Sequence, residues 1–461
     1  MKENQLTQGN ILKSLLRFAI PILLALFLQA MYGAVDLLVV GKFSQIADQS
    51  GVATGSMFTT AFGNVITCFA IGVTVLISEA IGSKQKEKAS KAIGTGIILF
   101  LLIGLISTLI LTIFAPQIAV LMNAPTDAVS QTTNYIRICG GGILFIIAYN
   151  IIGAIFRGIG DSKTPLITVA IACVINIGGD FLFVVGLNMG ASGAALATII
   201  AQAFSVIASL IIIKFRNIPI KLNKKDIRLD PYYVKRIVMI GLPVALQELL
   251  VGFSFIFIQS TVNKIGLVES AAIGVGEKVC AFLMLVASAF MQSMAAFVAQ
   301  NNGAKQTDRS RKALLYGIEA ALIAGILMGL LAFLAGDHLA SIFSNDSQVI
   351  AATHSYLKAY SIDCVMTAVL FCFIGYFNGC EKTIFVMFQG IFGSFLVRIP
   401  LVYLFSQIGN ESLFLIGLAT PISSLVQIII CLIAYFIFRK KDKAQEAKKI
   451  TDDGSLNQED A

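Results

Sequence analysis

The chain has 461 residues, of which 57% are hydrophobic and only 13% charged, about half the charged fraction of a soluble domain. This composition excludes a water-soluble globule, a disordered chain, a secreted disulfide scaffold and a β-barrel, and it leaves room for about twelve membrane-spanning helices of ~20 residues each. The net charge of +8 does not indicate nucleic-acid binding, because the basic residues lie in short loops between apolar runs.

Apolar runs separated by polar breaks predict twelve membrane spans. In chain order they are Leu15–Val40, Val52–Ala80, Ile93–Ala115, Ile136–Phe156, Pro165–Val185, Ala191–Ile213, Ile237–Val262, Ala271–Ala299, Leu314–Ala335, Val349–Phe377, Ile384–Phe405 and Leu413–Phe438. We therefore expect an all-α integral membrane protein. The first run is too long for the apolar core of a signal peptide, so we expect it to remain as the first span.

Lysine and arginine are distributed unequally between the two sides of these spans. The side that holds both termini carries 28 of the 34 basic residues, including eight in the loop between the sixth and seventh spans. Cytoplasmic loops are enriched in lysine and arginine, so this distribution predicts that both termini lie in the cytoplasm.

The two halves of the chain resemble each other at an offset near 221 residues. Residues 82–89 match 303–310, and the Ala-Ile-Pro-Ile at 19–22 matches the Gly-Leu-Pro-Val at 241–244. An even number of spans per half gives both halves the same orientation, which predicts twelve transmembrane helices in two six-helix lobes related by a pseudo-two-fold axis along the membrane normal. We expect the lobes at residues 1–213 and 237–438, with a cytoplasmic inter-lobe loop at 214–236 and a charged cytoplasmic tail at 439–461.

Two carboxylic acids lie deep in the first half, where an ionisable residue costs about 2.5–3.5 kcal/mol. Asp36 and Asp180 lie at similar depth in the outer thirds of the first and fifth spans, and Asn176 shares the helix face of Asp180. The second half has no acid at either equivalent position; Asp36 corresponds to Ile258. This asymmetry favours a proton or cation site, in which two neighbouring carboxyl groups would share a proton. Structural capping of each acid by a nearby Asn or Thr is the alternative.

Further charged residues lie within the predicted spans of the second half: Glu248, Glu277, Lys278, Asp363 and Arg398. They permit neutral pairs such as Lys278 with Glu248 or Arg398 with Asp363, and the sequence leaves structural and functional roles open.

Pro21 lies early in the first span and removes one backbone hydrogen bond there. Because it shares this helix with Asp36, we expect it to be a hinge that links ion binding to bending. The eight Cys form no CxxC pair, the two His form no HExxH motif, and no GxxxxGK[ST] motif occurs. We therefore expect no metal centre, no cofactor and no ATP-driven step.

These features together resemble the MATE (multidrug and toxic compound extrusion) family of bacterial efflux antiporters. The resemblance extends from about Gly9 to Arg439 and is carried by the two like halves and three motifs. The motifs are the series Pro21, Gln29, Tyr32 and Asp36; the loop Arg157-Gly158-Ile159-Gly160-Asp161-Ser162-Lys163-Thr164-Pro165; and the pair Asn176 and Asp180.

The resemblance implies a V-shaped pair of lobes, in a monomer of the bacterial plasma (inner) membrane, that exports small organic cations in exchange for H⁺ or Na⁺. It implies an ion-coupling site in the first lobe and a cavity lined by Gln29 and Tyr32. The residues implied for the ion site are Asp36, Asp180, Asn176, Thr198 and, from the fourth span, Asn150. Na⁺ is possible at Asp36 and Asp180, although H⁺ is the expected ion.

One branch of the family has acids on the seventh and tenth spans that form a cation site in the second lobe. Glu248 and Asp363 are on those spans, but each is about one turn from the expected place. We therefore assign them to the substrate cavity and expect the ion site in the first lobe.

Two other functions remain open. Lipid-linked precursor flippases share this architecture, but a flippase for anionic headgroups should line its cavity with several basic residues, and only Lys278 and Arg398 lie deep. An integral membrane transferase would require a polar catalytic loop, which the outer loops do not provide. The residues therefore favour a transporter of cations, not an enzyme.

Overall fold

The computed structural model describes residues 6–216, 220, 222–408 and 412–459, which include helices but no strands. The helices of the first half are α1 (Ile11–Phe43), α2 (Ile46–Gly82), α3 (Lys86–Ile113), α4 (Ala115–Leu121), η1 (Thr126–Ala128), α5 (Val129–Gly141), α6 (Ile143–Ile159), α7 (Lys163–Asp180), η2 (Phe181–Gly186) and α8 (Gly190–Phe215). Those that follow are η3 (Lys224–Asp226), α9 (Pro231–Val262), α10 (Leu267–Leu283), α11 (Leu285–Gly303), α12 (Thr307–Leu334), α13 (Gly336–Ser341), α14 (Ser347–Gly379), α15 (Thr383–Ile391), η4 (Phe392–Arg398), α16 (Ile399–Ile408) and α17 (Leu413–Glu459). Part of the predicted inter-lobe loop, at 217–219 and 221, lies outside the described residues.

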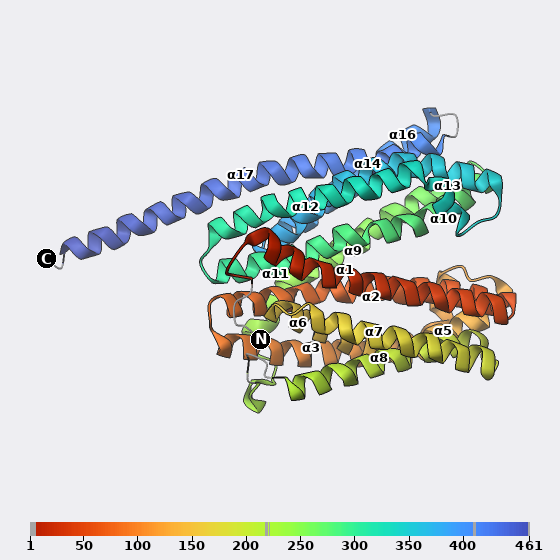
Figure 1. The fold of residues 1–461 in the computed structure, drawn as a ribbon, viewed down its shortest axis with the longest axis horizontal. Coiled ribbons are helices and arrows are strands. Elements are labelled where there is room, and N and C mark those ends of the chain that lie inside the picture. The colour runs from red at the N-terminus through yellow and green to blue at the C-terminus, as the bar shows by residue number, and fades with distance from the viewer. Residues whose placement is uncertain (1–5, 217–219, 221, 409–411, 460–461) are drawn as a thin grey trace.

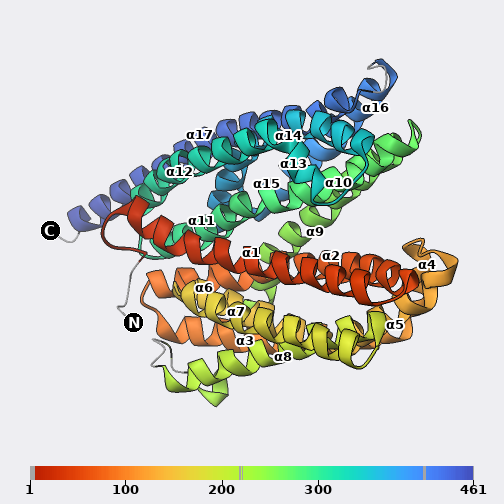
Figure 2. The same cartoon turned by 45° about the vertical axis from the view of Figure 1, so that its right-hand side comes forward.

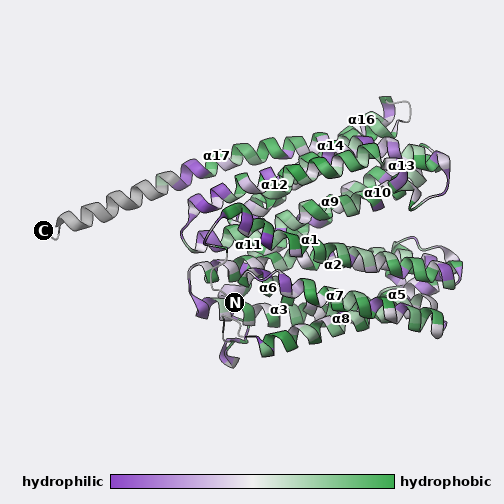
Figure 3. Cartoon of the chain, in the orientation of Figure 1, coloured by the Kyte–Doolittle hydropathy of each residue, from purple (hydrophilic) through white to green (hydrophobic). Residues whose placement is uncertain are grey.

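The described residues contain eleven helices long and apolar enough to cross a membrane, or twelve if one bent pair is counted as a span. Apolar residues cover the middle of the helices and hydrophilic residues gather near their ends (Figure 3). The predicted all-α, multi-span membrane fold is therefore confirmed.

The fourth span is bent, although the sequence predicted one continuous helix over Ile136–Phe156. The segments Thr126–Gly141 and Ile143–Ile159 meet at 52°, with Gly142 between them. A Cβ atom on Gly142 would lie 2.3 Å from the side chain of Ile199 in α8. Only glycine allows α8 to pack this closely against the bend.

The internal repeat is visible in the backbone. Lys84 and Lys305, which are 221 residues apart, both have φ of +58° just after α2 and α11. Gly160 and Glu381 are separated by the same interval and have φ of +90° and +59° after α6 and α14. The two halves therefore end equivalent helices with the same left-handed turn.

The start of α1 and the end of α17 lie at the same end of the helical bundle, here called the terminal end; the opposite end is the far end (Figures 1 and 2). The hydrophobic core consists of four clusters of buried residues. Two clusters contain residues of both halves, and their contacts between halves come from the terminal parts of α1, α2, α9 and α11. The other two clusters belong to the far end, and each contains buried residues of one half alone. The two lobes thus pack together toward the terminal end and have separate cores toward the far end.

Polar contacts reinforce the joint between the halves at the terminal end. Gln300 of α11 donates a hydrogen bond of 2.9 Å to the carbonyl oxygen of Gly158. Arg236 of α9 forms an ion pair of 3.1 Å with Glu79 of α2 and also contacts Glu381 of its own half. Arg309 of α12 donates hydrogen bonds to backbone carbonyls of the segment 6–9, which precedes α1.

Candidate ion-binding site

Asp36 occupies the far half of α1, and its side chain points into the interior of the first lobe. The residue is only 3% exposed. Its Oδ2 atom accepts a hydrogen bond of 3.1 Å from the hydroxyl of Thr198 in α8, whereas Oδ1 has no hydrogen-bond partner. Sequence positions 36 and 198 are thus brought together by the packing of α1 against α8.

Asp180 is the last residue of α7 and is fully buried. Its carboxyl group lies within hydrogen-bonding reach of the carboxyl group of Asp36. Asn176, one turn earlier, approaches Asp36 as well, and its amide nitrogen lies 3.5 Å from the Thr198 hydroxyl. The structure therefore brings together four of the five residues expected at the ion site.

The cluster has many acceptor atoms and few donors. Four buried oxygen atoms of this cluster have no hydrogen-bond partner: Asp36 Oδ1, Asp180 Oδ1, Asp180 Oδ2 and Asn176 Oδ1. No ion pair among the described residues involves Asp36 or Asp180. A buried acceptor without a donor is costly, so this cluster is suited to hold a proton or a small cation.

A second polar layer lies one helical turn nearer the terminal end. Gln202 donates a hydrogen bond of 3.0 Å to the hydroxyl of Tyr32, and Gln29 lies within reach of the same hydroxyl. Tyr32 lies four residues before Asp36 on α1, and Gln202 lies four residues after Thr198 on α8. Both layers therefore share the same helix faces. Gln202 was not among the site residues predicted from the sequence. Its spacing of four residues from Thr198 within an apolar run was the available signal.

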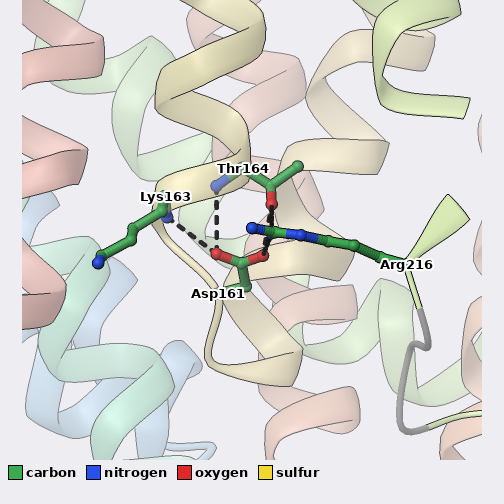
Figure 4. Close-up of polar contacts among 4 residues, drawn as sticks. All are labelled: Asp161, Lys163, Thr164 and Arg216. Atoms are coloured by element: carbon green, nitrogen blue, oxygen red, sulfur yellow. Dashed lines mark hydrogen bonds and ion pairs between the residues drawn. The ribbon is translucent and has the colours of Figure 1, made fainter. Parts of the chain in front are cut away.

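Asn176 and Asp180 lie on α7, and the start of this helix is held by the loop at residues 157–165. Asp161 accepts hydrogen bonds from the backbone N–H groups of Lys163 (3.0 Å) and Thr164 (3.1 Å) and from the hydroxyl of Thr164 (Figure 4). Arg216, just after α8, donates to the same hydroxyl at 2.9 Å and lies 3.4 Å from Asp161. This cluster ties the start of α7 to the end of α8, the two helices that contribute Asp180 and Thr198.

Asn150 does not join the cluster. It accepts a hydrogen bond of 2.7 Å from Thr67 of α2 and donates to the carbonyl oxygen of Ile146 within α6. No hydrogen bond in the described part of the chain connects it to the two acids. The bend at Gly142 changes the direction of α6, so spacing along a straight span was a poor guide to this side chain.

The charged residues of the second half do not form the pairs that the sequence permitted. Lys278 is exposed, and its Nζ atom lies 5.9 Å from the ring centre of Phe343 instead of pairing with Glu248. Glu248 is exposed on α9 on the side of Cys68 in α2. Within the described residues, these two charged side chains have no ion-pair partner.

Asp363 and Arg398 are both buried but are not in direct contact within 4.0 Å in the described structure. Asp363 accepts a hydrogen bond of 2.6 Å from Ser424, while Arg398 donates to Ser254 at 3.1 Å and lies over the ring of Phe255. Asp363 thus has a hydrogen-bond donor of its own, unlike Asp180.

Pro21 is buried within α1, which the structure shows as one helix from Ile11 to Phe43. It lies in the part of α1 that packs against α11, because its neighbours Phe18 and Ile22 belong to a core cluster shared with the second half. The hinge role assigned to it stays a prediction.

Comparison with known proteins identifies relatives over most of the chain. A family model described as MatE matches residues 21–182 and again 243–404. The chain is similar to the probable multidrug resistance protein YoeA of Bacillus subtilis (strain 168), with 27% identity over 362 residues that cover 76% of this chain and 77% of that protein. It is also similar to the multidrug export protein MepA of Staphylococcus haemolyticus, with 24% identity, covering 88% of this chain and 90% of that protein.

Solved structures share the fold. One, described as the outward-facing conformation of a multidrug resistance MATE family transporter, has a TM-score of 0.87 and covers 97% of this chain and 99% of its own. Another, a transporter of the MOP superfamily from Pyrococcus furiosus Vc1, has a TM-score of 0.88 and covers 94% and 97%. Each is 20% identical in sequence to this chain, so the likeness shows the fold alone.

Proposed function

The chain belongs to the MatE family and is therefore a transporter and not an enzyme, and from that premise we propose that it is a secondary active multidrug efflux antiporter. In this proposal it exports small organic cations and takes up one inorganic ion in exchange. The relatives named as multidrug resistance and export proteins support the cargo class.

The observation that carries the proposed coupling is the set of four buried acceptor oxygens of Asp36, Asp180 and Asn176 that have no hydrogen-bond partner. One proton between the two carboxyl groups would give each acid a partner and remove one of two like charges from a low-dielectric interior. We therefore propose H⁺ as the coupling ion. Na⁺ is the alternative ion, since carboxylate, amide and hydroxyl oxygens also bind hard cations.

The separate far-end cores and the shared terminal-end core support alternating access of a cleft between the lobes. When the cleft opens at the far end, Asp36 and Asp180 take up the ion and the cargo leaves. When the lobes part at the terminal end, the ion is released and the two negative charges favour entry of a cation. Bending of α1 at Pro21 would couple these events, because Pro21 and Asp36 share this helix.

The distribution of basic residues supports placing the terminal end in the cytoplasm of a bacterium, with the far end outside the plasma membrane. In this orientation a proton enters the cytoplasm as the cargo leaves. Exchange of one proton for one monovalent organic cation moves no net charge, so the pH gradient drives it and supplies about 1.4 kcal/mol, or a tenfold cargo gradient, per pH unit.

Gln29 and Tyr32 support a cargo contact next to the ion layer, because Tyr32 is linked through Gln202 to the helix face that carries Thr198. A lipophilic cation beside Tyr32 would be attracted by the face of the Tyr32 ring and by the negative charge of the two acids one turn away. Loss of those acids' charge on ion uptake would then weaken cargo binding.

Ethidium transport in everted membrane vesicles tests the proposal. We expect Asp36→Asn to abolish ΔpH-driven transport, because the pair then has no exchangeable charge at position 36. The matched control is Asp127→Asn, which neutralises an exposed acid in the same half. Transport by Asp36→Asn at the level of the wild type would refute a coupling role for the pair.

Proton release from the purified protein separates the two ions. If H⁺ is the coupling ion, addition of tetraphenylphosphonium should release protons from the wild type without Na⁺, and Asp180→Asn should release none. Proton release that occurs only with Na⁺ present, or not at all while transport follows a Na⁺ gradient, would assign coupling to Na⁺.

A further inference from the structure

A recess at the terminal end of the second half is separate from the ion-binding cluster. It lies between α14, the start of α15 and the end of the apolar part of α17, and its volume is about 30 Å³. The residues that line it are Tyr376, Phe377, Cys380, Lys382, Tyr435, Phe438, Arg439 and Asp442. The ion site does not use these residues, and Tyr376 and Phe377 also belong to the core cluster that both halves share.

Aromatic side chains form the apolar wall of the recess. The ring of Phe377 packs edge-on against Phe385 and Phe438, with ring centres 4.9 and 6.0 Å apart. Tyr376 packs edge-on against Tyr435, with ring centres 5.7 Å apart. These rings form a packed aromatic surface, and Tyr is enriched where membrane proteins meet the headgroup region.

Two cations line this wall. The Nζ atom of Lys382 lies 5.4 Å from the ring centre of Phe438, and Arg439 also lines the recess. Asp442 is the one carboxylate among the lining residues, and it lies 3.7 Å from Arg311 of α12, which also pairs with Asp308. The charge of Asp442 is thus partly neutralised from outside the recess, whereas Lys382 and Arg439 remain as its basic lining.

The surrounding surface is apolar. On α15, Ile384 and Phe388 are 50% and 63% exposed, and on α17, Phe436 is 59% exposed. In a membrane-spanning chain such side chains face acyl chains. A ligand here therefore meets basic donors at the membrane edge and hydrocarbon next to them.

We propose that this recess binds the phosphodiester headgroup of an anionic phospholipid. The phosphate oxygens accept hydrogen bonds from Lys382 and Arg439, and the acyl chains lie along α15 and α17. This assignment is independent of the coupling mechanism and uses only the proposed orientation, which puts the recess in the cytoplasmic leaflet.

Native mass spectrometry of the purified full-length protein tests the assignment, with dioleoyl phosphatidylglycerol as the anionic probe and dioleoyl phosphatidylcholine as the neutral probe. The wild type should retain phosphatidylglycerol preferentially. Each basic residue near a headgroup contributes about 1 kcal/mol, or about a fivefold change in affinity. We therefore expect Lys382→Gln with Arg439→Gln to weaken phosphatidylglycerol binding roughly 25-fold.

The control is Lys305→Gln with Lys312→Gln, which removes two cations from the same end of the same half but outside the recess. It should bind phosphatidylglycerol like the wild type. Asp442→Asn guards against loss of binding through misfolding. It removes the one carboxylate among the lining residues, which repels the phosphate, so binding should become about fivefold tighter.

Equal retention of the two lipids by the wild type would overturn the assignment, as would unchanged phosphatidylglycerol binding in the Lys382→Gln, Arg439→Gln protein. Displacement of the lipid by an equal concentration of inorganic phosphate would also overturn it, because the ligand would then be a soluble anion. Asp36→Asn should still bind phosphatidylglycerol like the wild type, so failure of the lipid site and failure of the proposed transport are distinguishable.

Discussion

Gly82 of α2 and Gly303 of α11 occupy equivalent positions in the two halves, and each lies against the backbone of the opposite half. A Cβ atom on Gly82 would lie 1.9 Å from the carbonyl oxygen of Gln300, and one on Gly303 would lie 2.1 Å from that of Glu79. Glu79 and Gln300 are themselves 221 residues apart, so the contact is reciprocal. The absence of side chains at both glycines allows the lobes to meet at the terminal end.

Substitution of either glycine by leucine should force α2 and α11 apart. Overpacking costs about 1–3 kcal/mol, which would shift the equilibrium about 5- to 150-fold toward a state open at the terminal end. Pulsed electron paramagnetic resonance between spin labels at Lys88 and Thr307 should then report a longer distance.

Gly63→Leu is the matched control for this substitution. Gly63 also belongs to α2, but a Cβ atom there has no neighbour within 4 Å. If Gly82→Leu and Gly63→Leu give the same label distance, the glycine contact does not hold the lobes together.

The ion pair of Arg236 with Glu79 provides a second, electrostatic contact at the joint. Arg236→Glu would place an acid beside Glu79 and Glu381 and should therefore favour separation of the lobes. The double variant Arg236→Glu, Glu79→Arg should restore part of the contact. The groups are partly exposed, so we expect an effect of about 1 kcal/mol or less that weakens at high salt. The same label distance, measured at low and high salt, checks this; a distance independent of charge and salt would contradict it.

The hydroxyl of Thr198 is the donor that stabilises the charged form of Asp36. Thr198→Val removes it with little change of volume, so the acid pair should hold its proton more tightly. A hydrogen bond to a charged group contributes about 1.5–3 kcal/mol, and substrate-induced proton release should therefore move to higher pH by roughly one to two units. Thr198→Ser retains a hydroxyl and should behave like the wild type. A valine variant with an unchanged pH profile would show that the hydroxyl does not act on the ion.

Asp161 should contribute to stability and not directly to ion binding. Asp161→Ala removes the acceptor at the start of α7 and the contact with Arg216, and loss of such a cap costs about 1 kcal/mol. Thermal unfolding of the purified protein should show a lower midpoint for Asp161→Ala and a smaller decrease for Asp161→Asn, whose amide oxygen can still accept. Equal midpoints for Asp161→Ala and the wild type would rule out this capping role.

Local hydropathy predicted the spans well because the energy of burying a helix in lipid depends on about 20 consecutive residues. It did not predict the bend at Gly142, which depends on the distance to Ile199 in another helix. For the same reason the expectation for Asn150 was not met: its partner Thr67 is 83 residues away.

The sequence by itself determined that this is a membrane protein of two repeated halves, with two acids in the first half that have no counterpart at the equivalent positions of the second half. Those properties follow from composition, spacing and the cost of charge in a membrane, all of which are readable along the chain. Only the tertiary structure decided that Asp36 meets Asp180 and Thr198, that Asp363 receives its hydrogen bond from Ser424, and that the lobes meet at the terminal end. These contacts depend on how each helix is rotated and packed against its neighbours, and a one-dimensional pattern of hydropathy does not specify that rotation.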